Sequence, residues 1–250
     1  MTSQIPSDAV EASSSAAPRR RGIWPLLRDV IVIVAIAVIV SFAVKTFFVR
    51  SFYIPSGSME QTLLINDRIL VDELTPRFSG YERGDVVVFR DPGGWLTPQA
   101  DAPEQVPLVE AVDWLLSLVG VTASDSDEHL IKRIIGVGGD HVVCCNALGQ
   151  ITVNGTPIDE SVYLDLEEGQ TAPTEVPFDV VVPEDSLWVL GDNRDHSRDS
   201  RYNTDQPTQG FVPLENVVGR AFLVTWPFTR FGAIDAHHEV FSGVPATEPQ

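Results

Sequence analysis

A single long apolar segment places the strongest constraint on how this chain can fold. Residues 30–49 are almost wholly apolar, and about twenty such residues suffice to cross a bilayer as a helix. Lys45 lies near one end, where its side chain can reach the interface. Arginines cluster before the segment at residues 19–21, and such residues stay on the cytoplasmic side of a membrane. The sequence therefore predicts one N-terminal transmembrane anchor, single-pass, with everything after Arg50 outside the cytoplasm.

The alternative is a cleaved secretory signal, because Ser41-Phe42-Ala43 has the small-x-small pattern of a cleavage site. The apolar run continues beyond it through Phe47 and Phe48, which favours a retained anchor. Residues 1–17 are rich in Ser and Ala without apolar periodicity, so residues 1–29 are predicted to form a disordered cytoplasmic tail.

Composition excludes some classes of function. The chain has 250 residues and a formal net charge of -18, which argues against a nucleic-acid partner. Of its 17 basic residues only Lys45 and Lys132 are lysines, and lysine is the basic side chain that can lose its proton when buried. Cys144 and Cys145 are adjacent, which fits no metal-ligand spacing; a vicinal disulfide is possible, but two ordinary thiols are the favoured interpretation.

Short apolar segments separated by turn residues follow the anchor. They predict strands at residues 68–71, 85–90, 129–136, 142–145, 176–182, 186–190 and 217–226. Asn154-Gly155 within residues 150–158 is a strong hairpin signal. The predicted fold is mostly β: one large folded, antiparallel, barrel-like sheet system over residues 50–235.

Two segments are expected to lie outside this β framework. Within residues 91–128, a Pro- and Gly-rich stretch comes first and an acidic stretch comes last. Between them, the apolar residues of the segment 106–121 recur at helical spacing. We expect a short helical insertion there. Residues 236–250 are expected to form a loose C-terminal tail, and His237-His238 within it are too sparse for a metal site.

The segment Ile54-Pro55-Ser56-Gly57-Ser58-Met59 places two serines around one glycine directly after the anchor. A nucleophilic serine needs a base, a donor to the oxyanion and a shaped pocket. Gly57 permits a sharp turn and close approach to a ligand. Most Ser/Gly loops are only loops, so the rest of the chain must supply the other parts.

Two further stretches can supply them. Lys132 lies among apolar residues on a predicted strand, where burial would favour the neutral amine, a general base for a serine. The alternative is a lysine that reaches solvent from a strand edge. Residues 191–201 (GDNRDHSRDSR) are denser in Asp, Arg and Ser than a solvated turn requires, and they suggest a hydrogen-bonded scaffold.

Taken together, these three stretches resemble the motifs of the bacterial type I signal peptidases, Ser–Lys serine proteases of family S26. The matching residues are Pro-Ser-Gly-Ser-Met, Lys-Arg in a strand that ends in Gly-Gly-Asp, and Gly-Asp-Asn-Arg-Asp-x-Ser-x-Asp-Ser-Arg. The resemblance implies a serine endopeptidase of the cell membrane that removes signal peptides from exported preproteins after an Ala-x-Ala-like site. It implies no metal and no cofactor, and its partners are preprotein substrates and the lipid bilayer.

Carried over by position, the resemblance makes Ser58 the nucleophile, Lys132 the general base, Ser56 an oxyanion donor and Ser197 the residue that orients Lys132. Asp199 and Arg201 would form a supporting ion pair near Arg133. The substrate pocket for small side chains would be lined by Phe52, Ile54, Met59, Leu63, Leu130 and Ile131.

Three alternatives fit the residues less well. A Ser-His-Asp triad could use His196 beside Ser197, but the family does not need histidine there. A self-cleaving repressor would share the Ser–Lys chemistry, yet the chain has an anchor instead of a DNA-binding segment. A non-enzymatic envelope scaffold would be expected to have lost Ser56, Ser58 or Lys132.

Overall fold

The computed structural model describes residues 23–47, 49–96, 129–164 and 176–245. The chain divides into two compact units, Met1–Phe42 and Ala43–Gln250. The described helices and strands, in chain order, are α1 (Ile23–Phe47), β1 (Val49–Tyr53), β2 (Arg68–Asp72), α2 (Pro76–Ser79), β3 (Val86–Arg90), β4 (His129–Gly136), β5 (His141–Cys144), β6 (Thr152–Val153), β7 (Thr156–Pro157), β8 (Phe178–Val181), β9 (Ser186–Leu190), η2 (Ser200–Tyr202), β10 (Val212–Pro213), η3 (Leu214–Asn216), β11 (Val217–Trp226), η4 (Phe228–Arg230), β12 (Gly232–Ala233) and η5 (His238–Phe241).

Helix α1 coincides with the long apolar segment but begins earlier than expected. It starts at Ile23 and places Pro25 in its first turn, where a missing N–H costs no hydrogen bond. The described side chains between Leu27 and Val38 are mostly apolar and exposed. None of the helices in the described ranges meets the combined length and hydropathy requirement for a membrane span, so the anchor stays a prediction. Residues 1–22 of the expected tail lie outside the described residues.

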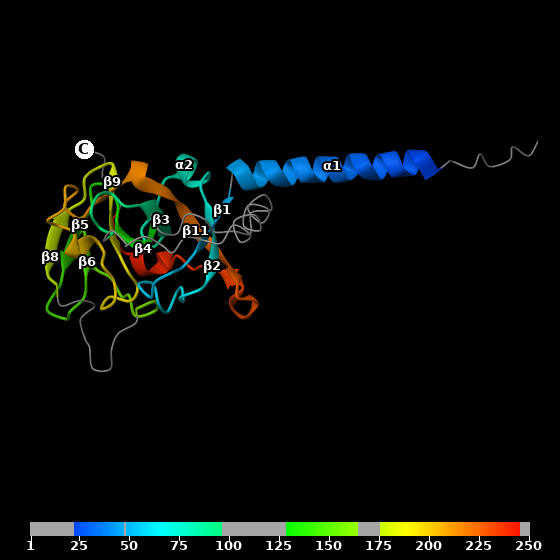
Figure 1. Ribbon diagram of the computed structural model, residues 1–250. Coiled ribbons are helices and arrows are strands. Elements are labelled where there is room, and N and C mark those ends of the chain that lie inside the picture. Colours follow the sequence, from blue (N-terminus) through cyan, green and yellow to red (C-terminus); the bar gives the residue numbers. More distant parts are fainter. Residues whose placement is uncertain (1–22, 48, 97–128, 165–175, 246–250) are drawn as a thin grey trace, which may run out of the picture. The chain divides into compact units, whose positions relative to one another are not determined.

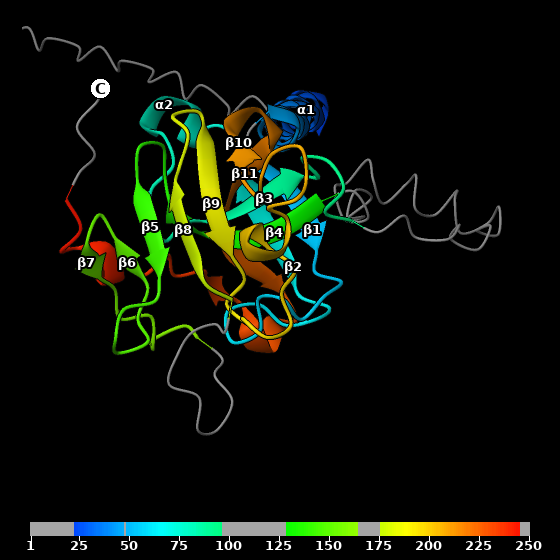
Figure 2. The same ribbon diagram turned by 90° about the vertical axis from the view of Figure 1, so that its left-hand side faces the viewer.

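The second unit contains two antiparallel sheets. In the described residues the larger sheet has eight strands in the order β1-β2-β11-β3-β4-β9-β10, with β12 paired to β11. The smaller has four strands in the order β7-β6-β5-β8. Figures 1 and 2 show the smaller sheet at one end of this unit and the β1–β2–β11 part of the larger sheet at the other. The mostly β class predicted from the short apolar segments is confirmed.

Three buried apolar clusters hold the sheets together. Phe52, Ile69 and Val224 belong to the cluster on the β1–β2–β11 part. Ile135, Val142 and Trp188 belong to a cluster with residues from both sheets. The third covers part of the larger sheet, where Phe89 packs against Trp95 with ring centroids 5.5 Å apart. These clusters fix β4, which carries Lys132, between β3 and β9.

The turn signal and most strand boundaries were predicted correctly, while the start of the expected insertion at residue 91 was not. Asn154 and Gly155 have φ of 51° and 77° in the β6–β7 turn, as the hairpin signal requires. Trp95, assigned to the insertion, is buried in the core. The helix expected at residues 106–121 lies outside the described residues.

Two expectations about the later chain were wrong. Residues 236–245 are not a loose tail, because η5 lies there and buries Phe241 in the cluster shared by the two sheets. Val240 and Val244 pack against the same cluster, so this segment supplies apolar surface that the sheets can cover. Cys144 and Cys145 are joined as a disulfide rather than free thiols. Cys144 is the last residue of β5, and the backbone after it brings the Cys145 sulfur beside that of Cys144.

Candidate active site

The Ser58 loop is a tight turn held on buried side chains. The backbone N–H of Glu60 donates to Gly57 O at 3.1 Å, and that of Leu63 donates to Met59 O at 2.7 Å. Met59 and Leu63 are buried and anchor the loop on the apolar core. A Cβ at Gly57 would lie 2.8 Å from the Glu60 carboxyl carbon, so a larger residue there would displace the Glu60 side chain. Ser58 is thereby held at a fixed place.

Lys132 meets this serine from the middle of β4. Its Nζ lies 2.8 Å from Ser58 Oγ and donates to Ile131 O at 2.8 Å. The residue is 4% exposed, because β4 lies between β3 and β9. When the amine is neutral, the same contact lets the Ser58 hydroxyl donate to the lone pair of Nζ. The structure thus joins the two residues that the sequence named as a dyad, 74 positions apart.

Burial determines the protonation of this lysine. It lowers the pKa of Lys132 from 10.5 to about 8, since the ammonium loses hydration. The carboxylates of Asp199 and Asp192 oppose the effect, and the guanidinium of Arg201 adds to it. Near neutral pH a useful fraction of the amine is therefore unprotonated, whereas an ordinary lysine would have almost none.

The other serines lie nearby with different partners. Ser56 is exposed and its Oγ lies 3.5 Å from Ser58 Oγ, so its hydroxyl can reach a group bound at Ser58. Ser197 is buried and donates to Asp199 Oδ2 at 2.8 Å. The hydrogen bond expected between Ser197 and Lys132 is not among those of the described residues. Ser197 therefore acts on Lys132 at most through Asp199.

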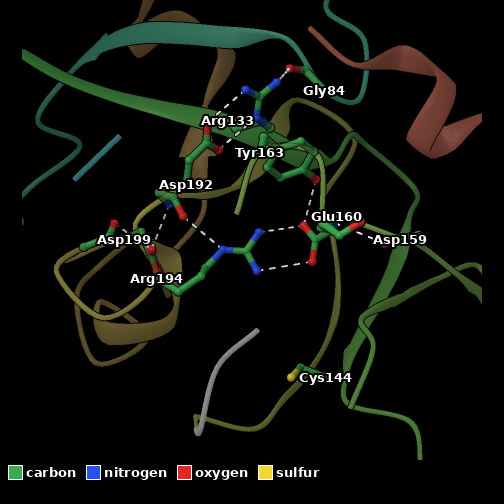
Figure 3. A network of polar contacts seen from close by, with 12 residues as sticks. Gly84, Arg133, Cys144, Asp159, Glu160, Tyr163, Asp192, Arg194 and Asp199 are labelled. Carbon is green, nitrogen blue, oxygen red and sulfur yellow. Dashed lines mark hydrogen bonds and ion pairs between the residues drawn. The ribbon is translucent and has the colours of Figure 1, made fainter. Parts of the chain in front are cut away.

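The residues next to the dyad belong to buried ion pairs, and Figure 3 shows two such pairs, Arg133 with Asp192 and Arg194 with Glu160. Asp199 holds Arg201 through two bonds, Nε to Oδ1 at 2.8 Å and Nη2 to Oδ2 at 2.7 Å. Arg133 was expected near this pair, but its own partner is Asp192, at 2.9 and 2.8 Å. All four side chains are 1% exposed or less. Paired charges of this kind can be buried, whereas single ones are costly.

The third motif also contacts the serine loop directly. The backbone N–H of Asn193 donates to Ser58 O at 3.2 Å, and its side chain donates to Glu60 Oε2 at 3.1 Å. A Cβ at Gly191 would lie 2.2 Å from Ser197 Oγ and 2.4 Å from Ser58 O. Only glycine allows this approach, so Gly191 sets how closely the two loops meet.

Five of the six predicted pocket residues lie together in one buried apolar cluster. They are Phe52, Ile54, Met59, Leu63 and Ile131, while Leu130 is half-buried against another cluster. Met59 follows Ser58 in the chain and Ile131 precedes Lys132, so this cluster adjoins the dyad. Their contact with a substrate stays a prediction.

His196 takes no part in the dyad. Its ring is exposed and its Nδ1 lies 3.2 Å from Asn193 Oδ1. No hydrogen bond of the described residues joins it to Ser58 or Ser197, which removes the geometric basis for a Ser-His-Asp triad.

Several residues around the site escaped sequence analysis. Thr62 donates to Asp192 Oδ2 and accepts from Arg133 Nη2 at 3.2 Å. Glu160 and Tyr163 approach from the segment after β7 (Figure 3). Asp192 lies in the stretch 191–201 that was predicted to be a hydrogen-bonded scaffold, but its partner Arg133 was not predicted. Glu160 and Tyr163 lie in an ordinary-looking turn, and no local pattern could have identified them.

Comparison with known proteins finds a family model and several relatives that match this chain. A family model described as signal peptidase, peptidase S26 matches residues 27–226. A signal peptidase I of Mycobacterium tuberculosis strain CDC 1551 is 40% identical over 83% of the chain and 75% of its own length. A probable signal peptidase I of Mycobacterium leprae is 36% identical over 94% of the chain and 87% of its own. A crystal structure of a signal peptidase I from Enterococcus faecalis V583 aligns at 22% identity with a TM-score of 0.34, covering 56% of the chain and 95% of that structure.

Proposed function

The chain belongs to the signal peptidase family S26 and is a serine peptidase of that family; from this premise we propose that it cleaves exported preproteins with Ser58 and Lys132 as its catalytic dyad. The observation that carries the proposal is the 2.8 Å contact between Lys132 Nζ and Ser58 Oγ in a buried site. A base within hydrogen-bond reach of a serine hydroxyl is the arrangement that activates serine as a nucleophile.

The reaction follows from the protonation states. The neutral Lys132 amine accepts the Ser58 proton while Oγ attacks the scissile carbonyl carbon. The Ser56 hydroxyl and the Ser58 backbone N–H donate to the oxyanion that forms. The Lys132 ammonium then gives its proton to the leaving amine as the peptide bond breaks. Water, deprotonated by the same amine, hydrolyses the Ser58 ester and restores the enzyme.

We further propose that the cleaved bond follows an Ala-x-Ala-like sequence. The support is the buried apolar cluster that contains Ile54, Met59 and Ile131, because Met59 follows Ser58 and Ile131 precedes Lys132 in the chain. A small side chain can be placed against such a cluster, whereas a large one would have to displace core residues.

Helix α1 is proposed to anchor the protein in the cell membrane, with its N-terminus in the cytoplasm and the catalytic unit outside. The exposed apolar side chains of α1, such as Ile33 and Val38, support an apolar environment. The arginines at residues 19–21 support the orientation. The substrate and the membrane are then the two partners of the enzyme.

The test is cleavage of a purified precursor by the detergent-solubilised full-length protein, beside Ser58→Ala and Lys132→Ala. The wild type should release the mature product, and both variants should lose cleavage while keeping the wild-type melting temperature within a few degrees. Ser79→Ala, at an exposed serine of α2, is the matched control and should cleave normally. Normal turnover by Ser58→Ala would refute the dyad, and an inactive wild type would refute the proposed function.

A further inference from the structure

Glu160 and Tyr163 reach the proposed active site from outside its three motifs. They follow β7 of the smaller sheet, and both side chains are buried, at 4% and 2% exposure. The Tyr163 hydroxyl donates to Glu160 Oε1 at 2.8 Å, and the Tyr163 N–H donates to Glu160 O at 3.1 Å. The two residues thus form one small rigid unit.

Glu160 connects to the nucleophile through Arg194. Its carboxylate accepts from Arg194 Nη1 and Nη2 at 3.2 and 2.6 Å. Arg194 Nε donates to Gly191 O at 2.9 Å, and Gly191 is the residue that meets Ser58 O without room for a side chain. A displaced Arg194 would therefore shift the loop against which the serine rests.

Tyr163 connects to the base through Arg133. The Arg133 guanidinium carbon lies 4.3 Å from the centre of the Tyr163 ring, a cation–π contact (Figure 3). Arg133 follows Lys132 on β4 and also donates to Thr62 in the serine loop. The ring therefore holds a side chain that belongs to the lysine strand and is bonded to the serine loop.

Each buried arginine of the network forms an ion pair with one buried carboxylate. Three buried arginines have three buried carboxylates: Arg133 with Asp192, Arg194 with Glu160, and Arg201 with Asp199. Lys132 is a further buried cation, and its two hydrogen bonds in the described residues go to neutral oxygens. Glu160 neutralises Arg194 directly, while the charge of Asp192 acts on both Arg194 and Lys132.

We propose that Glu160 and Tyr163 are positioning residues of the Ser58–Lys132 site, supplied by the segment that follows β7. The inference rests on the proposed catalytic roles of Ser58 and Lys132. Glu160 and Tyr163 touch neither reacting atom. They act by holding Arg194 and Arg133, which in turn fix the serine loop, the lysine strand and the charge balance around the amine.

The first test replaces Tyr163 in the full-length protein. Tyr163→Leu removes the ring from Arg133, so kcat for precursor cleavage should fall by about 10- to 100-fold with KM within about twofold, as expected for a small misplacement of reacting groups. Tyr163→Phe keeps the ring and should recover most of kcat. Tyr81→Leu, at a half-buried tyrosine packed against the third apolar cluster, is the matched control. Equal losses in Tyr81→Leu and Tyr163→Leu, or no loss in either, would overturn the proposal.

The second test measures the pKa of Lys132 and needs no cleavage assay. Because the chain has only two lysines, 13C-lysine labelling gives two side-chain NMR signals, and Lys132→Ala identifies that of Lys132. The charged and hydrogen-bonding groups that face Lys132 are the Ile131 carbonyl, Ser58, Asp192, Asp199 and Arg201. Glu160→Gln removes the negative charge that pairs with Arg194, so the remaining positive charge should lower the Lys132 pKa. Arg194→Met removes the positive charge that pairs with Glu160, so the remaining negative charge should raise the Lys132 pKa.

The double variant Glu160→Gln with Arg194→Met removes both charges and should return the Lys132 pKa toward the wild-type value. It also keeps the test possible if a single variant fails to fold. Asp140→Asn, which breaks the ion pair of buried Asp140 with half-buried Arg83 elsewhere, is the control and should leave the Lys132 pKa unchanged. Opposite shifts support the proposal even if the wild type cleaves no precursor, in which case only the proposed function fails. Identical Lys132 pKa values in all variants would overturn the positioning role proposed for Glu160 and Tyr163.

Discussion

Asp192 accepts two hydrogen bonds from Arg133, from Nε at 2.9 Å and from Nη2 at 2.8 Å, and both side chains are fully buried. The pair joins the strand of the proposed base to the polar loop that follows β9. Thr62 connects the serine loop to this pair, because its hydroxyl forms hydrogen bonds with both Asp192 and Arg133. One ion pair thus ties together three segments that are far apart in the sequence.

Breaking this pair should destabilise the protein. Asp192→Asn leaves a buried guanidinium without its counter-charge, which typically costs about 3–5 kcal/mol. Gly84 O, Asp235 O and Ala236 O still accept from Arg133, so we expect the lower end. Urea unfolding measures the loss, with Asp205→Asn at an exposed position as control, expected to stay within about 0.5 kcal/mol. A loss below about 1 kcal/mol would show that the pair contributes less than buried pairs typically do.

Cleavage should depend on deprotonation of Lys132. Only the neutral amine is a base, and its pKa is lowered to about 8, so kcat/KM should rise with pH through about 8 and then level off. Lys132→Arg keeps a positive charge that cannot be lost and should be as inactive as Lys132→Ala. Lys132→His should have faint activity at best. Substantial cleavage by Lys132→Arg would remove the lysine from the mechanism.

Ser56 should act on the transition state rather than on substrate binding. Loss of one oxyanion donor typically lowers kcat by about 100- to 1,000-fold, so Ser56→Ala should lose that much with KM nearly unchanged. Ser56→Thr keeps a hydroxyl and should lose less. Steady-state kinetics on a precursor peptide separate the two constants. A change confined to KM would make Ser56 a binding residue instead.

Substrates should carry a small residue just before the cut. Ile54, Met59 and Ile131 are packed in the core beside Ser58, and a bulky side chain would have to displace them. Two peptides that differ only in Ala or Phe at that position should differ in kcat/KM by at least about 100-fold. Equal cleavage of the two would contradict the pocket assignment.

The folded catalytic unit should bind lipid by itself. Trp226 and Phe228 are 48% and 76% exposed with ring centroids 5.0 Å apart, and aromatic residues of this kind favour the membrane interface. A protein that begins at Ser51 should co-sediment with anionic or neutral vesicles, and Trp226→Ser with Phe228→Ser should weaken binding. Leu148→Ser, at another exposed apolar residue, is the control. Equal binding by all variants would place the contact elsewhere.

The sequence by itself determined the elements whose information is local. Short apolar runs bounded by turn residues identified the strands that contain Val86–Arg90 and Ser186–Leu190, because a strand covered on both faces needs apolar side chains throughout. Asn154-Gly155 identified a turn because few residues adopt positive φ at low cost. The motifs around Ser58 and Lys132 identified the pair that the structure brings together.

Only the tertiary structure decided which charges are paired and which segments are buried. Arg133 meets Asp192 across 59 positions and Arg194 meets Glu160 across 34, and no local period encodes such contacts. Phe241 was expected in a loose tail, yet it is buried in the apolar cluster shared by the two sheets. Lys132 shows the difference between the two kinds of information. The sequence identified it as a lysine among apolar residues, but its pKa is lowered because strands on either side of β4 exclude water from the amine.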